Sequence, residues 1–333
     1  MSEVLIDNTG VMPLDPLKFR DPDRTATGEA RASVGLERLE TLWFNTGTLC
    51  NIECANCYVE SGPRNDRLAY VAAGEVEAYL DEVAALGLGT RQIGLTGGEP
   101  FMNPDILDII ELALGRGFEV LVLTNAMRPM QRARIRAGLT RLGERFGAAL
   151  TLRVSLDHYG KVLHETERGP GSYQVTLDGI DWLAANGLRI NLAGRTCWGE
   201  GEQAARAGYR RLAATRGWPI DADNRAELVL FPEMDERRDV PEITTRCWSI
   251  LGVDPRAMMC AASRMVVKRR GAASPHVVPC TLLPYDPRFE MGRTLAQSLA
   301  ADGGAFAHGG VKLNHPHCAR FCVLGGGSCS LQG

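Results

Sequence analysis

Three cysteines stand close together directly after a short apolar segment. They have the spacing C-x3-C-x2-C at Cys50, Cys54 and Cys57, and the apolar run 39–44 precedes them. Three thiolates on one tight loop can ligate three irons of a 4Fe–4S cluster and leave the fourth iron open. A structural zinc site usually has four protein ligands, and this loop has no histidine or fourth cysteine nearby. The spacing therefore favours an iron–sulfur cluster with one vacant iron.

A second motif, Thr96-Gly97-Gly98-Glu99-Pro100, follows the apolar run 93–95. Consecutive glycines at the end of a strand let a ligand approach the backbone closely, and the carboxylate offers an acceptor for an ammonium group. Each motif has a simpler explanation when taken alone, since buried thiols can meet by chance and Gly-Gly-Glu-Pro can be an ordinary turn. Their occurrence in one chain at this separation indicates a single binding site.

The two motifs resemble those of the radical S-adenosylmethionine (SAM) superfamily. The resemblance implies that the amino and carboxylate groups of SAM chelate the open iron, and that Gly97, Gly98 and Glu99 bind the amino group of SAM. The family usually has an aromatic residue just before the third cysteine, whereas this sequence has Asn56 there and Tyr58 just after that cysteine. We therefore take Tyr58 as the candidate cofactor contact at this position.

Composition and charge narrow the class of protein. The chain has 333 residues, 45% of them hydrophobic, and a formal net charge of −3, which is typical of a globular protein. No apolar run approaches the ~18 residues that span a bilayer, and the N-terminus lacks a basic segment followed by an apolar one. We therefore expect a cytoplasmic protein without a membrane partner. The near-neutral charge also disfavours nucleic acid as the main partner.

Short apolar runs alternate with segments of helical spacing between residues 39 and 233. Six strands are predicted, at Leu39–Asn45, Gln92–Thr96, Val120–Thr124, Leu150–Leu156, Arg189–Gly194 and Leu228–Phe231. Five helices are predicted between them, at Gly74–Leu86, Pro104–Gly115, Gln131–Phe146, Tyr173–Ala185 and Glu202–Arg216. This alternation predicts an α/β fold with a parallel sheet, either open or curled. The family resemblance implies the curled form, a (β/α)6 partial TIM barrel, which we place at residues 39–233 after an N-terminal arm at residues 1–38.

Polar residues stand where the predicted strands end, and parallel sheets carry their chemistry at that edge. The resemblance implies that Asn125 and Ser155 contact the ribose and carboxylate of SAM, and that Arg195 pairs with the carboxylate. His158 and Tyr159 follow the fourth strand, and we expect them to face the substrate, where a histidine can transfer a proton near neutral pH. Turn residues, surface ion pairs and a structural histidine are the alternatives for these positions.

Six of the ten cysteines lie in the last third of the chain, at Cys247, Cys260, Cys280, Cys318, Cys322 and Cys329. This region, residues 234–333, has many prolines and little periodicity, so it needs a metal centre to become ordered. It resembles the SPASM and twitch extensions of the family. That resemblance implies a second, auxiliary 4Fe–4S cluster on Cys260, Cys280, Cys318 and Cys322, with Cys329 or Cys247 as substitutes. The rival is a zinc site on His315, His317, Cys318 and Cys322.

The resemblance also implies the reaction. An electron donor such as flavodoxin or ferredoxin would reduce the first cluster, SAM would be cleaved to methionine and a 5′-deoxyadenosyl radical, and this radical would abstract hydrogen from a substrate carbon. We expect oxidation or rearrangement of a small molecule, because no leader-peptide recognition domain is evident before the core. The alternatives are a peptide maturase that forms an oxidised or cross-linked residue, and an iron–sulfur electron carrier. A carrier is disfavoured because it needs neither an open iron nor a Gly-Gly-Glu-Pro motif.

Overall fold

A single eight-stranded sheet organises the chain in the computed structural model, which describes residues 12–232 and 235–326. The strands follow the order β7-β6-β5-β4-β3-β2-β8-β9 across the sheet. Their bounds are β2 Thr41–Asn45, β3 Gln92–Thr96, β4 Glu119–Thr124, β5 Leu150–Ser155, β6 Arg189–Arg195, β7 Leu228–Phe231, β8 Ser263–Val267 and β9 His276–Val278. All neighbouring pairs from β7 to β8 are parallel, and β9 pairs antiparallel with β8. The predicted parallel α/β architecture is therefore confirmed.

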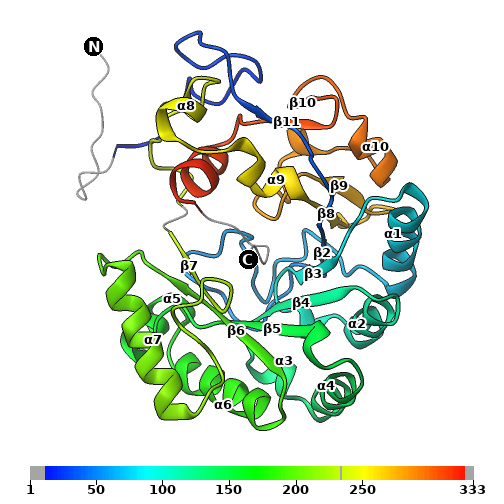
Figure 1. Cartoon of the computed structure of the whole chain (residues 1–333), viewed down its shortest axis with the longest axis vertical. Helices are drawn as coiled ribbons and strands as arrows, with labels where there is room; N and C mark the ends of the chain where they lie inside the picture. Colours follow the sequence, from blue (N-terminus) through cyan, green and yellow to red (C-terminus); the bar gives the residue numbers. More distant parts are fainter. Residues whose placement is uncertain (1–11, 233–234, 327–333) are drawn as a thin grey trace.

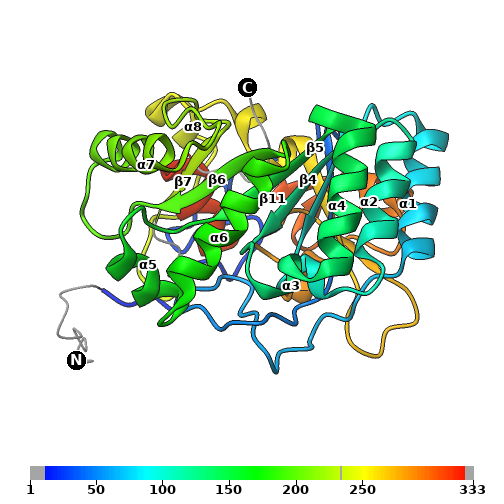
Figure 2. The ribbon, with the colours of Figure 1, turned by 90° about the horizontal axis from the view of Figure 1, so that it is seen from below.

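Five long helices lie along the outer side of the curved sheet (Figure 1). They are α1 Ala73–Leu86, α2 Ile106–Gly115, α4 Ala133–Phe146, α6 Ser172–Ala185 and α7 Glu202–Arg216. Figure 2 shows α1, α2 and α4 side by side. Apolar residues of α2 such as Ile109 and Ile110 are fully buried, as is Leu152 of β5. The helices thus cover the apolar outer face of the sheet, as expected for βα units.

The predicted and observed elements agree to within two residues at most ends, and three features were not predicted. A short helix, α3 Arg128–Gln131, precedes α4, and α5 Lys161–Arg168 follows β5. Strand β8, from the cysteine-rich C-terminal region, pairs with β2 and so extends the main sheet. The sequence pattern did not show this pairing because no long helix precedes β8, so the alternation of strands and helices that predicted the other parallel strands is missing there.

The remaining C-terminal elements are short, and they pack against the described part of the predicted N-terminal arm. These elements are β1 Ser33–Val34, α8 Cys247–Leu251, α9 Met259–Ala262, α10 Leu295–Leu299, β10 Phe306–Ala307, β11 Gly310–Lys312 and the π-helix η5 Cys318–Leu324. Strand β1 pairs antiparallel with β11. Arg31 forms a 2.6 Å ion pair with Glu242, and the side chain of Phe19 is also buried. Residues 12–38 are therefore part of the packed structure.

The predicted boundary between residues 233 and 234 falls on residues outside the described ranges. Among the helices of residues 12–232 and 235–326, none combines the length and the apolar character that a membrane span requires.

Candidate functional site

The thiols of Cys50, Cys54 and Cys57 line one cavity at the carboxyl edge of the sheet. The last residues of four adjacent strands, β3 to β6, contribute to the same cavity: Thr96, Thr124, Ser155 and Arg195. The structure also brings most of the predicted cofactor contacts to this lining, namely Tyr58, Gly97, Gly98, Asn125, Ser155 and Arg195. Parallel pairing aligns these strand ends, which explains why residues so distant in sequence meet here.

The two glycines of the second motif allow two loops to pack closely. A Cβ atom on Gly98 would lie 2.1 Å from the carbonyl oxygen of Leu49, and one on Gly97 would lie 2.4 Å from that of Gly47. Gly97 also has a φ of +140°, a conformation that side chains disfavour. The glycines therefore fix the cysteine loop against the end of β3, besides lining the cavity. We had expected them only to admit a ligand.

Glu99 is not among the residues that line the cavity, although its hydrogen-bond partners Thr124 and Asn125 are. Its carboxylate accepts hydrogen bonds from the Thr124 hydroxyl at 2.8 Å and from the backbone N–H groups of Asn125 and Phe101 at 2.9 and 3.2 Å. The side chain is 2% exposed, and burial raises its pKa to about 7. Glu99 thus ties the ends of β3 and β4 together, and the structure does not bring its carboxylate to the cavity lining.

Asn125 and Arg195 connect the strand ends to the cysteine loop. The Asn125 amide donates to Oδ1 of Asn51 at 2.9 Å, and the Arg195 guanidinium donates to the carbonyl oxygen of Asn56 at 2.8 Å. Arg195 also lies 3.5 Å from the Asp157 carboxylate and 3.6 Å from that of Glu167. Both side chains are thereby held at the cavity in a defined orientation.

Three charged residues of the cavity lining were not predicted: Arg153, Asp157 and Arg168. Burial alone would raise the pKa of Asp157, but the neighbouring Arg168 and Arg195 guanidinium groups lower it below its usual value. Arg153 is 1% exposed in the middle of β5. An arginine inside a predicted buried strand was the sequence signal that could have identified it, because arginines are almost never fully buried unless they are paired.

His158 and Tyr159, which we expect to face the substrate, are not among the residues that line this cavity. Both contact Glu200: the Tyr159 hydroxyl donates to it at 2.7 Å, and His158 Nε2 lies 3.3 Å from its carboxylate. The His158 Nδ1 atom accepts the Gly160 N–H at 2.8 Å. These bonds satisfy the ring, so His158 matches the structural alternative.

The chemistry of the cysteine cavity fits an iron–sulfur cluster. Burial raises the pKa of Cys50 to about 12 and that of Cys54 to about 11, so the free thiols hold their protons until a metal displaces them. The Arg168 guanidinium is close enough to oppose these shifts, and it supplies positive charge beside the thiolates that a cluster requires. No three cysteine sulfurs within the described ranges lie within 4.8 Å of one another.

A second cavity brings together the four predicted auxiliary ligands. Cys260, Cys280, Cys318 and Cys322 line it, and the rest of the lining is mainly apolar, from Met258, Met259, Pro279, Leu282, Leu283, Val311 and Leu313, with His317. Three of these cysteines are buried and Cys322 is half-buried. Burial raises the pKa of Cys260 to about 11 and that of Cys318 to about 12. Four thiols from three separate segments, since Cys318 and Cys322 share η5, thus meet in one apolar cavity, as a cysteine-ligated cluster requires.

Arg264 is a buried cation beside two cysteines of the second cavity, Cys260 and Cys280. Its side chain is fully buried and donates to the carbonyl oxygens of Cys260 at 2.7 Å, Ser263 at 2.8 Å and Gly309 at 2.8 Å. Burial lowers its pKa to about 10, and Cys260 and Cys280 are close enough to oppose that shift. In the part of the chain that the structure describes, no carboxylate forms an ion pair with Arg264. A cluster on four thiolates carries net negative charge and would supply the missing counter-ion.

Of the alternative ligands named from the sequence, His317 lines this cavity, and Cys247 and His315 do not. Cys247 lies elsewhere, where its sulfur contacts Thr244 at 3.3 Å, and Cys329 lies outside the described residues. In the rival zinc set, the Nε2 atoms of His315 and His317 lie 3.6 and 3.5 Å from the Glu236 carboxylate. Cys318 and Cys322 instead share the second cavity with Cys260 and Cys280.

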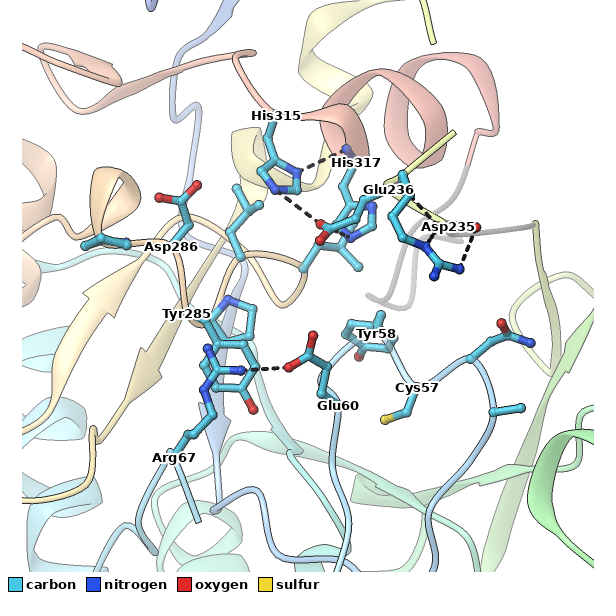
Figure 3. Close-up of a pocket in the computed structure, with 17 residues that line it drawn as sticks. Cys57, Tyr58, Glu60, Arg67, Asp235, Glu236, Tyr285, Asp286, His315 and His317 are labelled. Carbon is cyan, nitrogen blue, oxygen red and sulfur yellow. Dashed lines mark hydrogen bonds and ion pairs between the residues drawn. The ribbon is translucent and has the colours of Figure 1, made fainter. Parts of the chain in front are cut away.

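A third cavity lies between the cysteine loop and the C-terminal region (Figure 3). One wall is formed by Ala55, Asn56, Cys57, Tyr58 and Glu60, and the opposite wall by residues 282–287 with His315 and His317. Cys57 and Tyr58 also line the first cavity, and His317 also lines the second. The third cavity therefore borders both cysteine sites.

Comparisons with known proteins agree with this geometry. The family model described as Radical SAM superfamily matches residues 44–203. The antilisterial bacteriocin subtilosin biosynthesis protein AlbA of Bacillus subtilis (strain 168) is 29% identical over 145 residues, which are 43% of this chain and 30% of AlbA. The AdoMet-dependent heme synthase of Methanosarcina barkeri (strain Fusaro / DSM 804) is 32% identical over 143 residues, 40% of this chain and 36% of the synthase. The chain thus spans about a third of the length of these relatives.

The fold is similar to that of solved structures as well. The crystal structure of Streptococcus suis SuiB bound to S-adenosylmethionine superposes with a TM-score of 0.59 over 80% of this chain and 67% of that chain, at 11% sequence identity. At this identity the similarity concerns the fold alone.

Proposed function

Because the chain carries a radical SAM domain, which binds SAM and a 4Fe–4S cluster, we propose that it uses them to oxidise or rearrange a substrate. The observation that carries this proposal is the convergence of Cys50, Cys54 and Cys57 with the ends of four parallel strands in one cavity. When bound, the cluster and SAM supply a 5′-deoxyadenosyl radical that takes a hydrogen atom from a substrate carbon. A protein such as flavodoxin or ferredoxin is the proposed electron donor.

The residues of the chain would bind and orient these groups. Cys50, Cys54 and Cys57 would ligate the first cluster. Asn125 and Ser155 offer hydrogen-bonding groups at the strand ends, and Arg195 offers a guanidinium that suits the carboxylate of SAM. The buried carboxylate of Glu99 would act indirectly, because it positions the backbone of Asn125 through a 2.9 Å hydrogen bond.

The second group of cysteines would hold an auxiliary 4Fe–4S cluster, which provides one-electron transfer when bound. Cys260, Cys280, Cys318 and Cys322 are the proposed ligands. A substrate in the third cavity would lie next to both cysteine sites, which suits the oxidation of a substrate radical. A small molecule is our first candidate for the substrate. A peptide is the second, and the similarity to a bacteriocin biosynthesis protein favours it.

The test is the simultaneous replacement of Cys50, Cys54 and Cys57 by Ala in anaerobically reconstituted protein. We expect the variant to form no 5′-deoxyadenosine from SAM with dithionite, while about four irons remain on the auxiliary cysteines. The Cys247→Ala variant is the matched control, because Cys247 lines neither cysteine cavity. Cleavage of SAM by the triple variant would overturn the proposal for the first site, and an iron-free triple variant would overturn the auxiliary cluster.

A further inference from the structure

The third cavity has an excess of carboxylates in its lining. Four acidic residues, Glu60, Asp235, Glu236 and Asp286, stand against two arginines, Arg67 and Arg237. Three of the four carboxylates already have an arginine partner: Glu60 pairs with Arg67 at 2.7 Å, Asp235 with Arg237 at 2.8 Å, and Asp286 with Arg288 at 2.7 Å.

Glu236 differs from the other three carboxylates. In the described part of the chain it forms no ion pair with an arginine or lysine, and its charged contacts are His315 and His317. Burial raises the pKa of Glu236, and the neighbouring Glu60, Asp235 and Asp286 raise it further. The carboxylate therefore lies in a negative potential that a positively charged ligand would relieve.

The two histidines flank this carboxylate in different ways (Figure 3). His315 Nδ1 accepts the backbone N–H of His317 at 3.1 Å, so the proton of the neutral ring sits on Nε2, which faces Glu236. His317 is 4% exposed, and its buried Nδ1 has no partner among the described residues. Its Nε2 atom lies 3.5 Å from the Glu236 carboxylate, so His317 packs beside this carboxylate from the side of the four-cysteine cavity.

These three side chains come close enough together to suggest a metal site, because their ligand atoms lie within 4.8 Å of one another. The hydrogen bond from the His317 backbone N–H to His315 Nδ1 argues against a metal site. A ring that accepts a hydrogen bond at Nδ1 presents an N–H at Nε2, and a metal ion needs a lone pair there. The Glu236 carboxylate remains as an acceptor, and it suits the N–H groups of an ammonium ion.

We propose that Glu236, which His315 and His317 flank, binds a cationic nitrogen of the substrate, an ammonium or guanidinium group, in the cavity between the two cysteine sites. The cavity already accommodates one such interaction, since the Arg67 guanidinium lies 3.6 Å from the centre of the Tyr285 ring. Only the identification of the bound cation as the substrate rests on the proposed function. The cation site itself is independent of SAM cleavage.

The experiment measures binding of radiolabelled cadaverine, a dicationic amine, to the reconstituted full-length protein by anaerobic equilibrium dialysis without SAM. The neutral analogue 1,5-pentanediol serves as the comparison ligand. We expect cadaverine to bind, the diol not to compete, and Glu236→Gln to weaken cadaverine binding by roughly tenfold to a hundredfold, as expected for loss of a charge-assisted hydrogen bond. Because the Glu236 side chain is 55% exposed, the variant should fold normally.

The control variant is Asp254→Asn, which removes the same charge from an exposed carboxylate outside the cavity. Equal binding of cadaverine by the wild type and Glu236→Gln, or equal weakening by Asp254→Asn, would overturn the proposal. Metal content is measured by mass spectrometry after chelator treatment. One equivalent of zinc or manganese in the wild type, with none in Glu236→Gln, would also overturn the proposal. SAM cleavage is assayed separately on the wild-type protein, so a failure of the proposed function would be recognised independently.

Discussion

Replacing Arg264 by Met should destabilise the iron-loaded protein more than the iron-free protein. The substitution keeps an unbranched side chain of similar length but removes the charge and three hydrogen bonds of 2.7 to 2.8 Å to carbonyl oxygens. If a cluster is the counter-ion of Arg264, the loss of one partner of a buried pair should destabilise the iron-loaded protein by about 3–5 kcal/mol. In the iron-free protein the same change removes a buried cation that has no carboxylate partner, so the destabilisation should be smaller.

The reduction potential gives the sharper measurement. Loss of an adjacent positive charge disfavours the addition of an electron, and we expect the auxiliary potential to fall by at least about 59 mV, which is a tenfold change for a one-electron couple. The assay is a dye-mediated titration followed by electron paramagnetic resonance. It uses protein in which Cys50, Cys54 and Cys57 are replaced by Ala, so that only the second cluster contributes.

The control is Arg264→Lys, which retains the charge and should shift the potential by less than half as much. Identical potentials for the wild type and a folded, iron-loaded Arg264→Met variant would refute the counter-ion argument. Equal shifts in the Met and Lys variants would also refute it, because they would show that the hydrogen bonds matter and the charge does not.

Three further predictions concern stability and SAM binding. The pKa of Glu99 is raised from 4.5 to about 7 in the folded state, so its contribution to stability is most favourable below pH 4.5. This contribution declines by about 3 kcal/mol as the pH rises to 7. Urea unfolding of the iron-free protein between pH 4.5 and 8 should show this decline, and the Glu99→Gln variant should lack it. Arg31→Met should destabilise the protein by about 3 kcal/mol in urea unfolding because it leaves the 5% exposed Glu242 side chain without its cation, and a loss below 1 kcal/mol would contradict the importance of this pair. Arg195→Ala should weaken SAM binding about tenfold in anaerobic calorimetry, whereas His158→Ala, whose ring contacts Glu200 outside the cavity, should change it less than twofold; a larger effect of the histidine change would restore the role first predicted for it.

The sequence by itself determined the features that depend on local order. The spacing of Cys50, Cys54 and Cys57 and the Gly-Gly-Glu-Pro motif identified the family, and the family comparison confirms that identification. The βα alternation predicted six strands, all of which occur in the sheet. Such patterns are readable because a strand alternates its side chains and a helix repeats its apolar face every three to four residues. Even the gathering of Asn125, Ser155 and Arg195 followed from local order, since the carboxyl ends of parallel strands share one edge.

Only the tertiary structure decided where side chains point once the chain leaves a regular element. The turn after β3 directs Glu99 into bonds with Thr124 and Asn125, and the turn after β5 directs His158 to Glu200. No spacing rule connects Glu236 with His317, or Arg264 with the carbonyl of Gly309, because those residues come from segments that meet through long-range packing alone. The short strand β8 shows the same limit: its place beside β2 follows from edge-to-edge hydrogen bonding that five residues of sequence do not specify.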